Sequence, residues 1–472
     1  MPVPILTVAQ MREWERHAWA AGAREADVIS TVGRLAANRV RELTGDGDLV
    51  LLLAGKGHNG DDVRAMTPHL AGRKAELVNV LAPAQDLAAV RAALARRPAW
   101  VVDGLFGIGL NRPLADEWRA VVAAVNDAKL PVLAVDVPSG LDADTGSTHG
   151  AAIAATITVS VGAPKTGLLL PDASPWVGRL EVLPEVGLGD CPVATEGQWT
   201  LAGDFGDFPP RRPAGGHKGT FGHLTIFAGS SGYHGAAVLA ARAAQRAQPG
   251  LITLMTSPEV YVPVAAQLQA VMVSAAEAAV EPPSGTTALL WGPGLAAPPA
   301  RARFGLLLEQ AWKAAPVPVI VDASALDWLP PGELPARAIR VITPHPGEAA
   351  RLLQTTSAAV QQDRLAAVHK LSRRFGDCWV VLKGRHTVVG RSEGTFFVNS
   401  SGNPYLAQGG SGDALAGYLG GLLAQPALQA DPVKALRFAV WEHGAAADRL
   451  QERQPGWTVE DLVAALGSRL RP

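Results

Sequence analysis

Short runs of leucine and β-branched residues alternate with alanine-rich, helix-forming stretches along this chain, and this alternation constrains the fold more than any other feature. The runs cover residues 49–53, 76–81, 100–102, 132–136 and 156–161, and then 223–227, 251–255, 288–291, 317–321 and 379–383. Strands joined by helices pair in parallel, because a crossover connection returns the chain to the same edge of the sheet. The pattern predicts an α/β fold with parallel sheets that are covered by helices on both faces. Thr7 and Gln10 have the spacing of a capping box and predict where the first helix begins.

The length and the punctuation of the chain predict two domains. A chain of 472 residues exceeds what one hydrophobic core ordinarily organises. Between about residues 171 and 220 the alternation lapses into sequence that is rich in proline, glycine and aspartate, which is typical of a linker. We therefore place the boundary within residues 207–215 and predict domains at 1–207 and 208–472.

The composition excludes several classes of partner. The chain has 42 basic and 43 acidic residues and a net charge of −1, so no long-range field attracts nucleic acid or an anionic membrane. No apolar run approaches the ~20 residues of a membrane span. The cysteines, Cys191 and Cys378, lie far apart and lack metal-ligand spacing, which fits a reducing compartment. We expect a cytoplasmic protein with small-molecule partners, without nucleic acid or membrane, that forms a homo-oligomer.

A glycine-rich loop near the C-terminus carries the strongest chemical signal. Asn403 and Pro404 precede the glycine-rich residues 408–412, and an apolar, helix-forming stretch follows directly. Glycines let backbone N–H groups turn toward a phosphate, and the helix adds the positive end of its dipole. Asp413 stands where a carboxylate can reach a substrate hydroxyl. The segment predicts a nucleotide-using enzyme.

Five further motifs of the second half occur in a consistent order. They are a glycine-serine turn at 227–236, Gly-Pro-Gly at 292–294, Asp-Ala-Ser-Ala-Leu at 322–326, Thr-Pro-His-Pro-Gly-Glu at 343–348 and Lys-Gly-Arg-His-Thr at 383–387. With the 403–417 loop, this series resembles the ADP/ATP-dependent NAD(P)H-hydrate dehydratases of the ribokinase-like superfamily over residues 207–472. The chain departs from the family pattern at Ser401, where the family has Asn, and at Ser324, where it has a second acid. Position 324 is therefore not assigned a metal or ribose contact.

This resemblance implies a ribokinase-like domain that dehydrates hydrated NADH and NADPH with ADP or ATP as co-substrate, together with magnesium. Asp413 would be the base on the C6 hydroxyl and would contact the hydrate. The residues that would hold the nucleotide are Lys383, Gly384, Arg385, His386, Thr387, Asn403, Gln408, Gly409, Gly410, Ser411 and Gly412. Those that would hold the hydrate are Gly294, His345, Pro346, Gly347 and Glu348. For His345, a purely structural role at a helix start, satisfying backbone groups, is equally compatible with the sequence.

The first half places polar residues after successive strands. A glycine-rich segment at 55–62 follows the first run, and Asp103 and Asp136 end later runs. The carboxyl ends of parallel strands share one edge, where doubly wound sheets bind phosphates. Two acids at that edge indicate a cation or a catalytic carboxylate, because a buried carboxylate needs a partner. These motifs and residues 161–168 resemble the NAD(P)H-hydrate epimerases over residues 1–205, which implies a Rossmann-like doubly wound domain.

The epimerase resemblance implies interconversion of the R and S hydrates at C6, with Asp136 as acid/base and Lys165 as its electrostatic partner. Asn59, Asp103 and Ser139 match the ligands of a potassium ion. The residues that match the substrate site are His58, Asn59, Gly60, Asp61, Asp62, Gly107, Ile108, Gly109, Leu110, Asn111, Arg112, Pro113 and Asp136.

The chain departs from the epimerase pattern in the first glycine loop and in the helix before it. His58, Asp61 and Val63 replace an Asn and two Gly, and residues 29–33 lack the family's Leu-Met-Glu-x-Ala-Gly motif. Side chains at two glycine positions would crowd the phosphate approach or conflict with a positive φ, and Asp61 would add a negative charge.

The whole chain thus resembles a fused, bifunctional NAD(P)H-hydrate repair enzyme. Two alternatives stay open at this point. The first is a dehydratase with a non-catalytic N-terminal domain, and the second is a small-molecule kinase of the same superfamily. The preference for ADP or ATP and for NADH or NADPH hydrate is likewise open.

Overall fold

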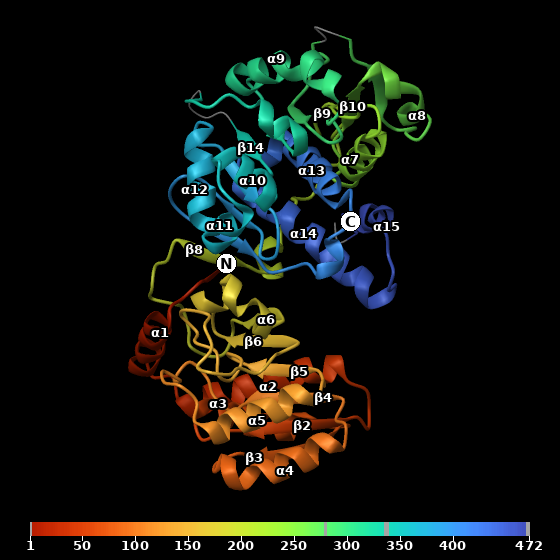
Figure 1. Ribbon diagram of the computed structural model, residues 1–472. Coiled ribbons are helices and arrows are strands. Elements are labelled where there is room, and N and C mark those ends of the chain that lie inside the picture. Colours follow the sequence, from red (N-terminus) through yellow and green to blue (C-terminus); the bar gives the residue numbers. More distant parts are fainter. Residues whose placement is uncertain (1, 278–280, 335–338, 469–472) are drawn as a thin grey trace. The chain divides into compact units, whose positions relative to one another are not determined.

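The computed structural model describes residues 2–277, 281–334 and 339–468 (Figure 1). The chain divides into two compact units, Val3–Trp199 and a second that begins at Thr200. The outer ends of the predicted domains, residue 1 and residues 469–472, lie outside the described residues. The boundary at 207/208 stays a prediction. No helix in the described part of the chain is long and apolar enough to cross a membrane.

The first unit is built on a parallel sheet with the order β3-β2-β4-β5-β6-β7. Its strands are β2 (Leu49–Ala54), β3 (Lys74–Asn79), β4 (Trp100–Gly104), β5 (Val132–Val135), β6 (Ile157–Val161) and β7 (Arg179–Leu183). The chain first adds β3 on one side of β2 and then adds β4 and the later strands on the other side. This change of direction gives a doubly wound sheet, in which the loops after the strands gather at the carboxyl edge. A short antiparallel pair, β1 (Val3–Pro4) with β8 (Gly197–Thr200), joins the two ends of this segment.

Helices cover this sheet because its central strands are apolar on both faces. Helices α4 (Pro83–Ala95) and α5 (Asp116–Asp127) pack Val90 and Val121 against Leu51 and Leu53 of β2. Helix α3 (His58–Met66) lies on β2 and β4 and packs against α2 (Glu25–Leu43). Helix α1 (Val8–Ala20) begins at the predicted capping box, in which Gln10 N donates to Thr7 Oγ1 at 3.3 Å. The short α6 (Ser174–Val177) precedes β7.

The second unit contains a larger mixed sheet with the order β17-β16-β15-β14-β13-β12-β9-β10-β11. Its strands are β9 (His223–Phe227), β10 (Leu251–Thr256), β11 (Met272–Ala275), β12 (Ala288–Trp291), β13 (Val319–Val321), β14 (Arg340–Ile342), β15 (Trp379–Leu382), β16 (Val388–Gly390) and β17 (Phe396–Asn399). The neighbouring strands β11, β10, β9, β12, β13, β14 and β15 pair in parallel. Strands β16 and β17 extend the sheet with antiparallel pairing.

The main core of this unit lies under α7 (His234–Arg246), α13 (Ser411–Leu423), α14 (Pro432–Arg453) and α15 (Val459–Ala465). Helices α13 and α7 touch closely because Gly417 has no side chain, since a Cβ there would lie 2.0 Å from the Ala240 carbonyl oxygen. The remaining helices are α8 (Tyr261–Ala265), α9 (Pro298–Ala314), α10 (Pro346–Leu353), α11 (Ser357–Gln362) and α12 (Arg364–Arg374).

The predicted fold class is confirmed, and all ten predicted runs are strands that agree with the structure to within two residues at each end. The interpretation of residues 171–220 as linker sequence throughout is wrong in part. That segment includes β7, which pairs with β6 at the edge of the first sheet, and β8. An edge strand is less covered than a central strand and can carry charged residues. Arg179 and Glu181 interrupt the apolar run of β7, so the sequence pattern does not mark it as a strand.

Candidate active sites

The carboxyl edge of the second sheet collects a lysine and two acidic groups. Asp322 follows β13, Thr343 follows β14 and Lys383 follows β15. Lys383 Nζ lies 2.6 Å from Asp322 Oδ1, to which the Thr343 hydroxyl also donates at 2.7 Å. A second carboxylate, Glu348 on α10, lies 3.9 Å from the ammonium. Burial lowers the pKa of Lys383, but Asp322 and Glu348 more than offset this and raise it, so the side chain stays a cation.

Asp413 faces this cluster from the start of α13. Gly410 caps the helix with a left-handed φ of 94°, and the first N–H groups of a helix have no carbonyl partner within it. A Cβ on Gly412 would lie 3.3 Å from Lys383 Nζ, so the helix start lies against the lysine. Burial, together with the charges of Asp322 and Glu348, raises the pKa of Asp413 to about 7, although Lys383 opposes this. Such a group takes up and releases protons near neutral pH.

The predicted hydrate residues at 345–348 form the beginning of α10. His345 is the N-cap, and its Nδ1 accepts from Gly347 N at 3.0 Å, while Glu348 Oε2 accepts from His345 N at 2.8 Å. The structural role of His345 at a helix start is thus present. Glu348 additionally points its carboxylate toward Lys383. Gly294 packs against the neighbouring turn, where its carbonyl accepts from the Ser230 hydroxyl at 2.6 Å.

The predicted nucleotide residues shape two turns. In the turn from β15 to β16, the Thr387 hydroxyl donates to Gly384 O at 3.0 Å, and burial lowers the pKa of His386 to about 3. In the loop before α13, Asn403 Nδ2 donates to Asp448 at 3.0 Å and Gln408 Nε2 donates to Tyr405 O at 2.8 Å. These side chains hold backbone in place, and the described contacts bring only Lys383 and the 410–413 segment together.

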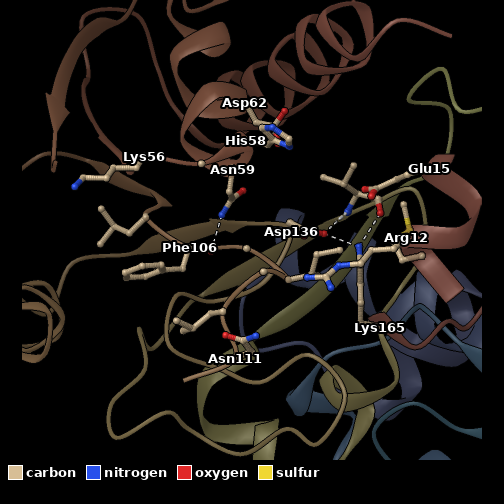
Figure 2. A pocket seen from close by; sticks show the side chains of 18 of the residues that line it. Arg12, Glu15, Lys56, His58, Asn59, Asp62, Phe106, Asn111, Asp136 and Lys165 are labelled. Atoms are coloured by element: carbon tan, nitrogen blue, oxygen red, sulfur yellow. Dashed lines mark hydrogen bonds and ion pairs between the residues drawn. The ribbon is translucent and has the colours of Figure 1, made fainter. Parts of the chain in front are cut away.

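The first unit has a cavity of about 1340 Å³ at the carboxyl edge of its sheet (Figure 2). The predicted site residues that line it are His58, Asn59, Asp62, Gly107, Ile108, Gly109, Leu110, Asn111, Arg112, Pro113, Asp136 and Lys165. Gly60 and Asp61 are not part of the lining. A Cβ on Gly60 would lie 2.2 Å from Gly55 O, so this glycine permits a close backbone contact. Asp61 pairs with Arg64 at 2.8 Å.

Asp136 and Lys165 form a buried ion pair within the cavity. Lys165 Nζ lies 2.5 Å from Asp136 Oδ1, and it also donates to Val161 O at 2.8 Å and to Ser160 Oγ at 3.2 Å (Figure 2). The Lys165 side chain is 1% exposed. Asp136 has a φ of 66°, a left-handed conformation that Asp tolerates better than most residues.

The predicted cation residues are joined by a chain of hydrogen bonds. Asn59 Nδ2 donates to Phe106 O at 2.7 Å, Phe106 N donates to Ser139 Oγ at 2.8 Å, and the Ser139 hydroxyl donates to Asp103 Oδ1 at 2.6 Å. Within the described residues, Asn59 Oδ1 is buried and has no hydrogen-bond partner. Burial raises the pKa of Asp103, against the effect of its bonds from Ser139 and Leu105. An unpartnered amide oxygen that this chain of hydrogen bonds links to a buried carboxyl fits a cation that prefers oxygen ligands.

The prediction that side chains at positions 61 and 63 would conflict with a positive φ is wrong. Residues 58–63 begin α3, so positions 61 and 63 have helical φ values and require no glycine. Val63 is buried in the core, and Asp61 is paired with Arg64. The charge of Asp61 still acts on its neighbour: burial first, then Asp136 and Asp61, raise the pKa of Asp62 to about 8.

Sequence reasoning missed lining residues on α1 and one acid at the second site. Arg12, Glu15, Arg16 and Trp19 line the first cavity. Their i, i+3, i+4 and i+7 spacing marks one helix face, but nothing in the sequence says that this face lies over the sheet edge. Asp322 was recognisable only as part of a strand-to-helix motif.

Comparison with known proteins identifies the family. A family profile described as NAD(P)H-hydrate dehydratase matches residues 224–466, and one described as YjeF-related protein N-terminus matches residues 83–167. The bifunctional NAD(P)H-hydrate repair enzyme Nnr of Coxiella burnetii is 32% identical over 495 residues and covers 98% of both chains. The enzyme of the same name from Gloeobacter violaceus is 35% identical over 505 residues, covering 98% of this chain and 96% of the relative.

Among solved structures, an ADP/ATP-dependent NAD(P)H-hydrate dehydratase from Bacillus subtilis, co-crystallised with ATP and Mg²⁺, matches with a TM-score of 0.48 and 30% identity, covering 54% of this chain and 91% of that one. The Coxiella and Gloeobacter relatives match nearly end to end, and the motif series of both halves had predicted the same pairing of functions. The chain belongs to the family of bifunctional NAD(P)H-hydrate repair enzymes.

Proposed function

We propose that the second unit dehydrates hydrated NADH and NADPH with ADP or ATP, and that Asp413 is its base. The observation that supports this most directly is a carboxyl group with a pKa of about 7 at the start of α13, beside the Lys383 ammonium. The C6 hydroxyl is a poor leaving group. Asp413 would take its proton while the oxygen accepts a phosphoryl group, after which phosphate leaves with that oxygen and the ring loses a proton.

Lys383 and the N–H groups of residues 410–412 would stabilise the negative charge on the transferred phosphoryl group. The nucleotide would enter with magnesium, which prefers oxygen ligands, and the carboxylates of Asp322 and Glu348 lie 2.6 Å and 3.9 Å from Lys383 Nζ. The predicted nucleotide and hydrate residues at 294, 345–348, 383–387 and 403–412 remain part of this proposal.

In the first unit, Asp136 would act as acid/base for exchange of the R and S hydrates, with the substrate in the cavity of Figure 2. Asn59, Asp103 and Ser139 would hold a potassium ion, which supplies a positive charge for the substrate's phosphates. The unpartnered Asn59 Oδ1 supports this ion. We place the two activities in domains 1–207 and 208–472.

One assay separates this function from the two alternatives. Chemically hydrated NADH is incubated with and without ADP or ATP, absorbance is followed at 340 nm, and the R and S epimers are resolved by chromatography. Recovery of absorbance with both epimers consumed indicates both activities. Consumption of one epimer alone, beyond spontaneous exchange, indicates a dehydratase only. A phosphorylated product without recovery of absorbance indicates a kinase.

A further inference from the structure

Exchange at C6 demands two proton-handling groups. The hydroxyl leaves from one face of the ring as water, because hydroxide is a poor leaving group, and water then adds to the opposite face and gives up a proton. One carboxyl on one side of the ring does not serve both events. This requirement rests on the proposed epimerase function and asks which second group in the cavity carries the proton.

The Asp136 and Lys165 pair supplies only the proton acceptor. An ammonium group has three N–H donors, and those of Lys165 are directed at Asp136, Val161 and Ser160. Lys165 therefore has no donor left for a substrate. Lys165 Nζ and Val161 N both donate to Asp136 Oδ1, so the protein holds this carboxyl as an acceptor.

Two other carboxyl groups line the same cavity, Glu15 on α1 and Asp62 on α3 (Figure 2). Within residues 2–277, 281–334 and 339–468, neither carboxyl takes part in a hydrogen bond or an ion pair with protein. Asp62 lies on α3, one helical turn from Asn59, a proposed potassium ligand, whereas Glu15 lies on α1. Asp62 is also only 9% exposed, whereas Glu15 is partly open to solvent, from which a spent acid must regain its proton.

We propose that Glu15 is the proton donor of the epimerase site and works as a pair with Asp136. Glu15 delivers its proton to the C6 hydroxyl, the C6–O bond breaks with its electrons on the departing water, and the N1 lone pair forms the C6–N1 double bond. Water adds to the opposite face of C6, the double bond returns its electrons to N1, and Asp136 accepts the proton. Solvent then returns a proton to Glu15 and removes the one on Asp136.

The electrostatics of the cavity support this division of roles. Burial and then the negative charge of Asp136 raise the pKa of Glu15, while Lys165, His58 and Arg12 oppose this. Asp62 adds a further acidic neighbour. A carboxyl whose surroundings raise its proton affinity, beside a second carboxyl that is paired with a lysine, is a usual arrangement of an acid and a base in one site.

The test uses the full-length chain and measures R to S exchange without nucleotide, in potassium buffer. Glu15→Gln should reduce the exchange rate by at least ~10²-fold while calorimetric binding of the hydrate stays unchanged. Glu15→Ala should regain part of its rate on addition of formic acid, in a saturable manner, because a small acid can occupy the vacated space. Glu13→Gln, on the exposed side of the same helix, is the matched control and should exchange at the wild-type rate. Dehydration by the same preparations reports folding of the second unit, and unchanged calorimetric binding of the hydrate reports folding of the first.

The outcomes separate this proposal from the proposed function. No exchange by the wild-type chain refutes the epimerase function itself. Wild-type exchange that persists within about threefold in Glu15→Gln overturns the assignment of Glu15. Loss of exchange in Asp62→Asn with normal exchange in Glu15→Gln moves the donor to Asp62 and also overturns it. If Glu15→Gln does not fold, the response of Glu15→Ala to formic acid tests the proposal instead. An exchange rate that formic acid leaves unchanged counts against Glu15 as the proton donor.

Discussion

Replacement of Asp413 by Asn tests the dehydratase site most sharply, because the same carboxyl should affect catalysis and stability in opposite directions. The variant lacks the proposed base and should lose at least ~10²-fold in dehydration rate. Nucleotide affinity should change little, because the proposed phosphate contacts are backbone N–H groups and Lys383. Asp207→Asn, an exposed position, is the control.

The stability effect follows from the raised pKa of Asp413. Its pKa is about 7 in the folded protein against 3.8 for an ordinary Asp, so the folded state binds the proton more tightly. Folding stability therefore falls as pH rises from about 4 to about 7, and the ionised group costs at most about 4 kcal/mol above that range, at 1.36 kcal/mol per unit. Asn carries no such cost.

Thermal unfolding of the wild-type and Asp413→Asn proteins at pH 5 and pH 8 measures this difference. We expect the variant to melt at a higher temperature than wild type at pH 8 and the gap to narrow at pH 5. Turnover within about threefold of wild type would remove Asp413 from the mechanism, and a variant that is less stable at pH 8 would refute the account of its burial.

Three further changes probe the remaining site assignments. Gly410→Val should weaken binding of ADP and ATP, because φ is 94° there and a Cβ would lie 2.5 Å from Leu239 Cδ1, and unchanged affinity by calorimetry counts against the loop. Asp136→Ala should stop exchange of the R and S hydrates while dehydration continues, and persistent exchange would show that another group accepts the proton. Replacing potassium by sodium should slow exchange by the wild-type protein. The Asn59→Ala variant should exchange slowly in both salts, because it lacks a potassium ligand. Equal wild-type rates in both salts would contradict the cation site.

The sequence predicted those parts of the fold and site that depend on local pattern. Central strands such as β2 and β9 are continuous apolar runs, and residues that follow strands, such as Asp103, Asp136 and Lys383, fall at a sheet edge in any parallel fold. The edge strand β7 and the short β14 lack such a signal. The placement of α1 over the cavity depends on long-range packing, so Glu15 could be assigned to the site only from the structure.

The Lys383 and Lys165 sites share one electrostatic arrangement that predicts opposite responses to pH. In each unit a lysine, with 1% of the Lys165 and 16% of the Lys383 side chain exposed, lies 2.5 to 2.6 Å from one carboxylate, Asp136 or Asp322, and a further acid nearby has a raised pKa. With Asp413 as the proposed base, the dehydration rate should rise with pH through about 7 and fall roughly tenfold per unit below it. With Glu15 as the proposed acid, the exchange rate should decline as pH rises above its raised pKa.

Both rates are measured on one preparation between pH 5 and 9, with the hydrate above its KM so that the profile reports the bound state. Glu15→Gln should lose the decline of exchange at high pH and keep the dehydration profile, because the two carboxyls lie in different units. A dehydration rate that is flat between pH 5.5 and 8 would contradict the role of Asp413. An exchange rate that rises throughout the range would contradict the role of Glu15, since a base and not an acid would then limit the reaction.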